Sequence, residues 1–515
     1  MESNPKRTTL TRMRNVECTF TMKHFYEYLL GAITIFWVFL MSSILVTNYF
    51  LFYNSIDFGN YVQALWSSVH GMSLLMSSHF FDNVAYPNVI VPSSFLENHF
   101  MPALFITTPF YALFPTPVTL SIFQSCLVAT GVIPVYLLAK KLTTPFEGFV
   151  FGIAYLCNPS LIFSVLNDFH AEVFLIPLLM FTFYFGYFQK WKSFILFSLL
   201  SCTVIEVAPF LVGSIVLYLF WTKKIRLYRF LSAGFLLAVY YIFAMSARYA
   251  LGFSPTYGEA PSFLSYYSVL GITQDSVFNV FTTAILHPAR ILPALTYQWY
   301  GKVFLLLFLF GNTLFLSLYH WKSVVLIAPW LSLALLSNFV SYYSPYFQYA
   351  GFVLFGITPL AILGYKQIRS KHTPKMFMYL ILFMILFVSL TGCMIALFQT
   401  NLVTGYLPPF SYPPYQANQN LINLIPVGAS VVSSPPYFTH VANRMDAWQL
   451  SVPDANATLQ ISQATVFLQH VTPQYVLLSE NLSSDYNSYW IYTHLVETKN
   501  YVLVANTTLL ALWKS

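Results

Sequence analysis

This sequence contains far fewer charged residues than a soluble protein. Only 8% of its 515 residues are charged and 57% are apolar, whereas roughly a quarter of an ordinary soluble chain is charged. So few charges cannot cover a globular surface in water, which excludes a soluble fold and makes lipid the expected solvent. Segments of about 20 apolar residues, enough to cross a hydrocarbon layer roughly 30 Å thick, recur until residue 399. The sequence therefore predicts a polytopic membrane protein.

Several functional signatures are also missing. Phosphate-loop and dinucleotide-binding glycine patterns are absent, so we do not expect cytosolic nucleotide hydrolysis to drive the protein. The five cysteines have no metal-type spacing and all precede residue 400, which argues against a zinc site or a disulfide framework. The net charge of +7 does not indicate nucleic acid, because the basic residues form short clusters between apolar segments, as the positive-inside rule explains.

The basic clusters constrain the topology. If all of them are cytosolic, an even number of crossings must separate each neighbouring pair. This predicts about eleven crossings, at residues 29–51, 118–139, 146–166, 173–189, 193–205, 207–221, 230–247, 303–319, 323–340, 346–365 and 376–399. In this arrangement 18 of the 24 Lys and Arg residues are cytosolic. The N-terminus is then cytosolic and the C-terminus extracytoplasmic, in a cell membrane.

Two segments are assigned by this parity alone. Residues 100–114 form a short apolar stretch that we expect to be re-entrant or to lie at the outer interface. The apolar run between Lys192 and Lys223 must make no crossing or two. We expect two short helices that turn at Glu206 near the outer face, because a broken helix is tolerated where protein or a wet cavity satisfies the freed backbone.

Three domains follow from this topology: a cytosolic segment at 1–28, a transmembrane domain at 29–399 with outer loops 52–117 and 248–301, and an extracytoplasmic domain at 400–515. We expect the last to be a small α/β domain after a proline-rich linker. Its predicted elements are strands Ala429–Ser433, Tyr475–Leu478 and Tyr501–Trp513, helix Leu459–His470 and linker Leu407–Tyr415. All three glycosylation sequons, at Asn456, Asn481 and Asn506, lie here, as expected of a translocated domain.

Seven ionisable residues lie at or near the outer ends of membrane segments, where charge is costly and indicates a functional site. They are Asp57, Glu97, His99, Asp168, His170, Glu172 and Glu206. Asp57 is equally compatible with capping the helix that follows and with catalysis. Glu97 and His99 start the re-entrant segment, where such exposed pairs are more often plain loop residues.

The segment Asn167–Glu172 and Glu206 present different alternatives. In a helix Asp168 and Glu172 would share a face, which suits a cap, whereas in an extended loop His170 would join them, which suits a metal site. The cap is favoured because a helix begins immediately afterwards. Glu206 lies in an apolar run with no Lys or Arg within a helical turn or two, so it must be paired, protonated or facing a cavity.

These motifs carry a family resemblance. An acid just after the first crossing, a His-Phe-Met-Pro-Ala-Leu segment, an aromatic-rich membrane core and a small outer α/β domain resemble the C-type glycosyltransferase (GT-C) superfamily. Within it the chain is similar to the predicted membrane proteins of domain of unknown function 2079. The motifs similar to that family are Asp57-Phe-Gly-Asn-Tyr-Val-Gln-Ala-Leu-Trp, Glu97-Asn-His-Phe, Asn167-Asp-Phe-His and Ile205-Glu206.

The resemblance implies sugar transfer on the extracytoplasmic side, from a polyprenyl-phosphate donor to a glycan, lipid or protein acceptor. Asp57 occupies the position that activates the acceptor in such enzymes. Beyond what the resemblance implies, we expect Glu206 and His99 to act with Asp57 in catalysis. The residues that we expect to bind substrate are Glu97, Asp168, His170, Glu172 and Arg248. A single acid stands where some members have two, so dependence on a divalent metal, Mg²⁺ or Mn²⁺, is left open.

Two other functional classes remain as alternatives. In a transporter or ion-coupled carrier, Glu206 and the Asp and His residues would bind an ion or relay protons. The bias of acids toward one face and the lack of similarly interrupted segments in two halves argue against this class. In a non-catalytic binder of lipid-linked glycans, the same groups would only hold the ligand.

Overall fold

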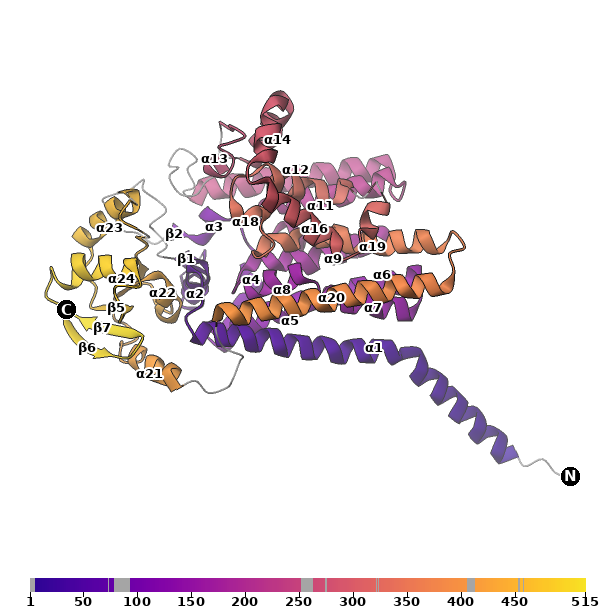
Figure 1. Cartoon of the computed structure of the whole chain (residues 1–515), viewed down its shortest axis with the longest axis horizontal. Coiled ribbons are helices and arrows are strands. Elements are labelled where there is room, and N and C mark those ends of the chain that lie inside the picture. The colour runs from indigo at the N-terminus through magenta and orange to yellow at the C-terminus, as the bar shows by residue number, and fades with distance from the viewer. Residues whose placement is uncertain are drawn as a thin grey trace.

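The structure, a computed structural model, is mainly helical up to residue 404 (Figure 1). It describes residues 5–515 except 73, 78–92, 252–262, 274–275, 321, 323, 405–412, 453 and 457. The first elements are α1 (Pro5–Phe50), α2 (Ile56–Val69), β1 (Met76–Ser77), β2 (Ser93–Ser94), α3 (Phe95–Asn98), α4 (Leu104–Leu113), α5 (Pro117–Ala129), α6 (Val132–Leu142), α7 (Pro145–Leu156), α8 (Pro159–Leu166), η2 (Ala171–Phe174), α9 (Leu175–Tyr187), α10 (Trp191–Cys202), α11 (Ala208–Trp221) and α12 (Leu227–Leu251). They are followed by α13 (Phe263–Tyr266), α14 (Val277–Leu286), η3 (Pro288–Arg290), α15 (Ile291–Thr296), α16 (Trp299–Gly311), η4 (Leu316–Tyr319), α17 (Val324–Leu336), α18 (Val340–Tyr343), η6 (Gln348–Val353), α19 (Leu354–Arg369) and α20 (Lys375–Thr404).

Every predicted crossing contains helix, but the helices differ in length. Among the described residues, five are long and apolar enough to cross a membrane: His24–Phe50, Pro117–Leu142, Leu227–Leu251, Gln348–Arg369 and Lys375–Gln399. The pair α7 and α8, bent by 41°, makes a sixth if it counts as one span. The remaining predicted crossings are apolar helices of 10–17 residues. The number of crossings therefore stays a prediction.

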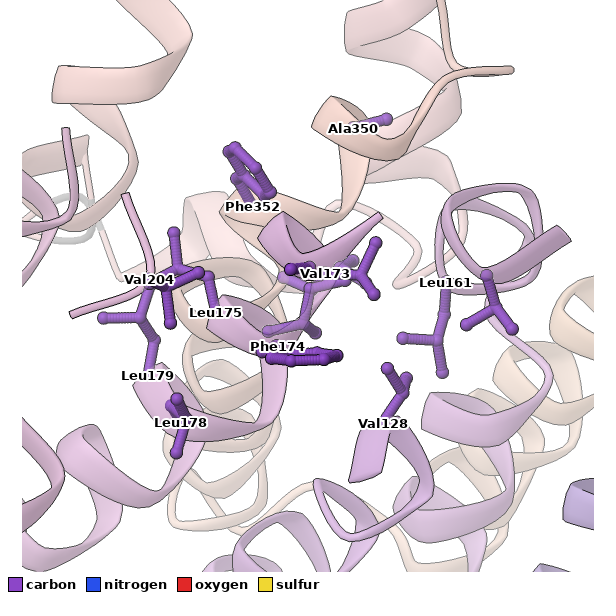
Figure 2. Packing of buried hydrophobic residues seen from close by; sticks show 14 of the residues in the cluster. Val128, Leu161, Val173, Phe174, Leu175, Leu178, Leu179, Val204, Ala350 and Phe352 are labelled. Atoms are coloured by element: carbon purple, nitrogen blue, oxygen red, sulfur yellow. The ribbon is translucent and has the colours of Figure 1, made fainter. Parts of the chain in front are cut away.

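The core combines short helices with two of the long spans, Pro117–Leu142 and Gln348–Arg369. Figure 2 shows side chains of this core from several elements: Phe174 of η2, Leu178 of α9, Val128 of α5, Leu161 of α8 and Phe352 of η6. By contrast, only 6% of the most apolar stretch of α12 is buried, and its exposed side chains are apolar. An apolar face that packs on nothing is what a helix next to lipid requires, so α12 borders the bundle whereas α9 lies inside it.

The predicted cytosolic clusters gather at one end of the bundle, called the inner end below. Lys141 lies over the Phe188 ring with 4.4 Å between its Nζ and the centroid, and Arg229 lies over Trp191 at 4.3 Å. The Gln189 side chain donates to the Lys224 carbonyl at 2.8 Å. Clusters far apart in sequence thus lie on one side, as the parity argument requires, whereas the compartment that this side faces stays a prediction.

Residues 413–515 form a small α/β unit around a five-stranded sheet of order β4-β3-β5-β7-β6. Strands β3, β4 and β5 are parallel, and β7 and β6 continue the sheet antiparallel. The elements are α21 (Pro413–Ile422), β3 (Val431–Ser433), α22 (Pro435–Val441), β4 (Ala447–Gln449), α23 (Thr458–His470), β5 (Tyr475–Ser479), α24 (Tyr486–Ile491), η7 (Tyr492–Val496), β6 (Val502–Asn506) and β7 (Leu510–Lys514). The predicted single run Tyr501–Trp513 is two strands, because the chain turns at Thr507, whose backbone N–H donates to Leu510.

Figure 1 places this C-terminal unit at the end of the bundle opposite the N-terminus, beside α2 and α3. We call this the outer end. Most of the predicted proline-rich linker, Leu407–Tyr415, lies outside the described residues, and its last three residues begin α21. The outer end therefore combines the start of α2, the loops between helices and the C-terminal unit.

Candidate functional site

Asp57 lies at the outer end in the first turn of α2. The helix begins at Ile56 after Ser55, so Asp57 is its second residue and not its N-cap. The capping interpretation of Asp57 therefore does not describe this helix. Its side chain is 62% exposed, and Oδ2 lies 3.5 Å from Nε2 of His170. This places an accessible carboxylate above a buried imidazole.

His170 lies between two carboxylates. Its Nε2 faces Asp57 and its Nδ1 is 2.9 Å from Oδ1 of Asp168. The other oxygen of Asp168 accepts the backbone N–H of Ser55, just before α2. Burial alone would lower the pKa of His170, but the charge and contact of Asp168 and the contact with Asp57 raise it well above its usual value. At neutral pH His170 is therefore an imidazolium that ties Asp57 to Asp168.

This geometry corrects the prediction that Asp168 caps the next helix. Asp168 has φ of +53° and His170 is extended, so both side chains turn toward α2. The 3-10 turn η2 begins after His170 without a side-chain cap. Glu172, within that turn, accepts a 2.8 Å hydrogen bond from the Tyr61 hydroxyl of α2. Contacts with the start of α2, made by Asp168 to the Ser55 N–H and by His170 to Asp57, outweigh capping here, and local sequence reasoning cannot foresee them.

A second cluster surrounds Glu206. The chain turns at Glu206 between α10 and α11, as predicted. Its Oε1 lies 3.0 Å from Nδ1 of His99 and 3.7 Å from Nη1 of Arg248. Arg248 also donates through Nε to the Glu97 carbonyl at 3.0 Å. Glu206 thus has two charged partners, both near Oε1, and they come from distant parts of the chain.

Opposite charges fix the protonation of this second cluster. Burial would raise the pKa of Glu206, but His99 and Arg248 lower it to about 2. Burial would lower the pKa of His99, but Glu206 raises it above its usual value. Glu206 is therefore a carboxylate at neutral pH, and its charge favours the imidazolium form of His99. When His99 is protonated, Glu206, His99 and Arg248 together carry one net positive charge.

Tyr61 connects the two clusters. Its ring centroid lies 4.8 Å from that of Phe95 in α3, the short helix that precedes His99, and 6.3 Å from the ring of His170. Glu172, bonded to Tyr61, is also close enough to raise the pKa of His99. All eight sequence-predicted site residues therefore meet in one region at the outer end.

Comparison with known proteins identifies the family. The profile of the predicted membrane proteins DUF2079 matches residues 47–507. The chain belongs to this family. No curated protein matches the sequence of this DUF2079 chain.

Solved structures give the fold of the DUF2079 chain. ArnT from Cupriavidus metallidurans bound to undecaprenyl phosphate is 11% identical over 95% of this chain and 98% of its own, with a TM-score of 0.52. The oligosaccharyltransferase from Archaeoglobus fulgidus tethered with an acceptor peptide is 13% identical over 94% of this chain and 73% of its own, with a TM-score of 0.47. At such identities the likeness to ArnT shows a shared GT-C fold, as the sequence motifs predicted.

Two side chains of the DUF2079 site escaped the sequence analysis. Tyr61 is one of many aromatics, and only its bond to Glu172 distinguishes it. Gln124 is fully buried in α5 and donates to the Asp168 carbonyl at 2.7 Å while accepting from the His170 N–H at 2.9 Å. A glutamine within an apolar helix is a detectable signal for the second residue, because a buried amide requires partners.

Among the described residues, no three His, Cys, Asp or Glu side chains are placed to hold a metal ion. The other two outer cations of the membrane domain are engaged elsewhere, since Arg290 donates to the Gly271 carbonyl at 2.7 Å and Lys302 to the Ala294 carbonyl at 2.5 Å. Arg248 is therefore the outer cation that lies within the site.

Proposed function

We propose that this protein is a GT-C-type glycosyltransferase that moves a sugar from a polyprenyl-phosphate donor to an acceptor at the extracytoplasmic face. The observation that carries the proposal is the Asp57–His170–Asp168 chain, an exposed carboxylate oriented by a buried imidazolium. A general base requires a carboxylate that the acceptor can reach and that its surroundings hold in place. The shared fold with ArnT, whose structure contains undecaprenyl phosphate, supports the donor class.

The second cluster suits the leaving group. As the acceptor oxygen or nitrogen bonds to the anomeric carbon of the sugar, its proton passes to Asp57. The bond between that carbon and the phosphate oxygen breaks, and polyprenyl phosphate leaves with the electron pair. Arg248 and the His99 imidazolium, which is 35% exposed, can stabilise the departing phosphate by charge and hydrogen bonds. Glu206 holds these two cations in place.

The test measures donor binding and sugar transfer with synthetic polyprenyl-phosphate sugars and a panel of acceptors. We expect Asp57→Asn to bind donor like wild type and to transfer sugar about a hundredfold more slowly or worse, because the amide cannot take the proton. Glu497→Gln, an isosteric change at an exposed site in the C-terminal unit, is the matched control.

Each outcome separates the functional classes. Donor binding without transfer by wild type would favour a non-catalytic binder. Ion uptake into proteoliposomes without donor binding would favour a transporter. Full transfer activity in Asp57→Asn would remove Asp57 from the mechanism.

A further inference from the structure

One segment of the C-terminal unit lies directly on the helix that carries Asp57. We call residues 435–447 the docking segment: they comprise α22 and the loop that leads to β4. Figure 1 shows α22 between the sheet and α2, and the two helices are in contact. Residues separated by more than 370 positions in sequence therefore meet next to the candidate site.

Gln63 of α2 anchors the loop of the docking segment. Its side chain is fully buried, and Nε2 donates to the carbonyls of Arg444 at 2.7 Å and of Met445 and Ala447 at 3.2 Å. Its Oε1 accepts a hydrogen bond from Ser77 at 3.1 Å. Buried donors left without partners are costly, so these bonds hold the loop at one height along α2.

Gly59 lets α22 approach α2 closely. A Cβ at this position would lie 2.3 Å from Cδ1 of Phe438, closer than any real contact. The Phe438 ring therefore occupies the space that any other residue at position 59 would need. This contact fixes the separation of the two helices, as the Gln63 bonds fix their register.

The docking segment also contacts residues that precede and follow α2 in the sequence. His440 stacks on Tyr49 at the end of α1, with ring centroids 4.1 Å apart, and donates through Nε2 to the Tyr49 carbonyl at 3.0 Å. Asn443 accepts from the Tyr111 hydroxyl and donates to the Pro115 carbonyl at 3.1 Å. The contacts thus reach both ends of the first outer region of the membrane domain.

We propose that the docking segment positions Asp57, with Gly59, Gln63 and Phe438 as positioning residues for the reaction. Residues four apart share a helix face and residues two apart lie about 200° apart. Asp57 and Tyr61 therefore face the site while Gly59 and Gln63 face the docking segment. The packing of α22 against one face of α2 therefore fixes the position of the Asp57 carboxylate on the opposite face. The inference rests on the proposed function for its effect on turnover.

The test is a double-mutant cycle between Gly59 and Phe438, measured on the full chain. We expect Gly59→Ala to lower turnover about tenfold or more while polyprenyl phosphate binds with an unchanged Kd, because a displacement near 1 Å can cost about a hundredfold in rate. In the Phe438→Ala background the same change should alter turnover less than about twofold, since the clashing ring is gone. Gly428→Ala, where a Cβ meets nothing within 4 Å, is the matched control.

A second readout does not depend on turnover. Carbodiimide labelling of the Asp57 carboxyl, followed by mass spectrometry, should change at least threefold in Gly59→Ala and return to the Phe438→Ala rate in the double variant. Equal effects of Gly59→Ala in both backgrounds, or no effect on labelling, would overturn the positioning role. Absence of transfer by wild type, with the labelling cycle intact, would refute the proposed function alone.

Discussion

Carboxylates lie at both ends of the bundle, but their partners differ. At the inner end, Glu147 accepts from Arg369 at 2.5 Å and from the Tyr365 hydroxyl at 2.8 Å, and Glu27 pairs with Lys140. At the outer end, five carboxylates lie in one region with one arginine and two histidines. These five are Asp57, Glu97, Asp168, Glu172 and Glu206.

This difference distinguishes a structural ion pair from a site. Each inner acid has its own cation: Glu27 pairs with Lys140, and Glu147 pairs with Arg369. Among the described residues, none of these four inner side chains has a buried polar atom without a hydrogen-bond partner. At the outer end, Oε2 of Glu206 is buried without a hydrogen-bond partner. Carboxylates in excess of their cations, and histidines with shifted pKa, are typical of functional sites.

The largest effect should come from removing the arginine at each end. Arg248→Met and Arg369→Met each leave a buried glutamate without its guanidinium. We expect the free energy of unfolding to fall by about 3 kcal/mol in Arg248→Met, and by less in Arg369→Met because the Arg369 side chain is 42% exposed. Only Arg248→Met should also weaken polyprenyl-phosphate binding, by about tenfold or more. Denaturation in detergent and a binding titration measure the two quantities. Weaker binding in Arg369→Met as well would erase the distinction between the ends.

The next effect concerns the imidazole below Asp57. His170→Gln should lower turnover by about tenfold to a hundredfold, the range of lost acid–base assistance, because the Asp57 carboxylate loses its charged partner. Donor affinity should change less than about threefold, since the second cluster is intact. Steady-state kinetics with measured donor Kd test this, with His470→Gln, an exposed histidine of α23, as the control. Wild-type turnover in His170→Gln would remove the link between His170 and the base.

A smaller effect is a pH dependence confined to the outer end. The folded pKa values of His99 and His170 are raised, so their stabilising charge is fully present below about 6.5, the unfolded value. It is lost as pH rises through the folded values. The melting temperature should therefore fall on the alkaline side of 6.5, and less steeply in His99→Gln. An identical slope in wild type and His99→Gln would contradict this assignment.

The smallest effect is a matched pair of hydroxyl deletions. Tyr61→Phe at the outer end and Tyr365→Phe at the inner end each remove one 2.8 Å hydrogen bond to a glutamate. Each should cost about 1–2 kcal/mol of stability. Transfer activity per folded molecule should fall only in Tyr61→Phe, because Tyr61 connects the two outer clusters. Thermal melts and transfer assays at equal folded amounts would show whether the loss follows the position.

Sequence alone predicted features that depend on local composition. Apolar length placed helices in all the predicted crossings, and basic clusters predicted which helix ends lie together. The sequence also selected Asp57, His170 and Glu206, because a charge beside an apolar run is conspicuous wherever it points.

Tertiary structure alone decided the pairing. The sequence around Glu206 does not indicate that its partners are His99, 107 residues before it, and Arg248 on α12. Local preference favoured Asp168 as a cap, but contacts with Ser55 and His170 outweighed that preference. The sequence likewise does not predict that Phe438 packs on Gly59. The physical reason is that apolar character and charge are properties of single residues, whereas the partner of a residue is set by how distant helices pack.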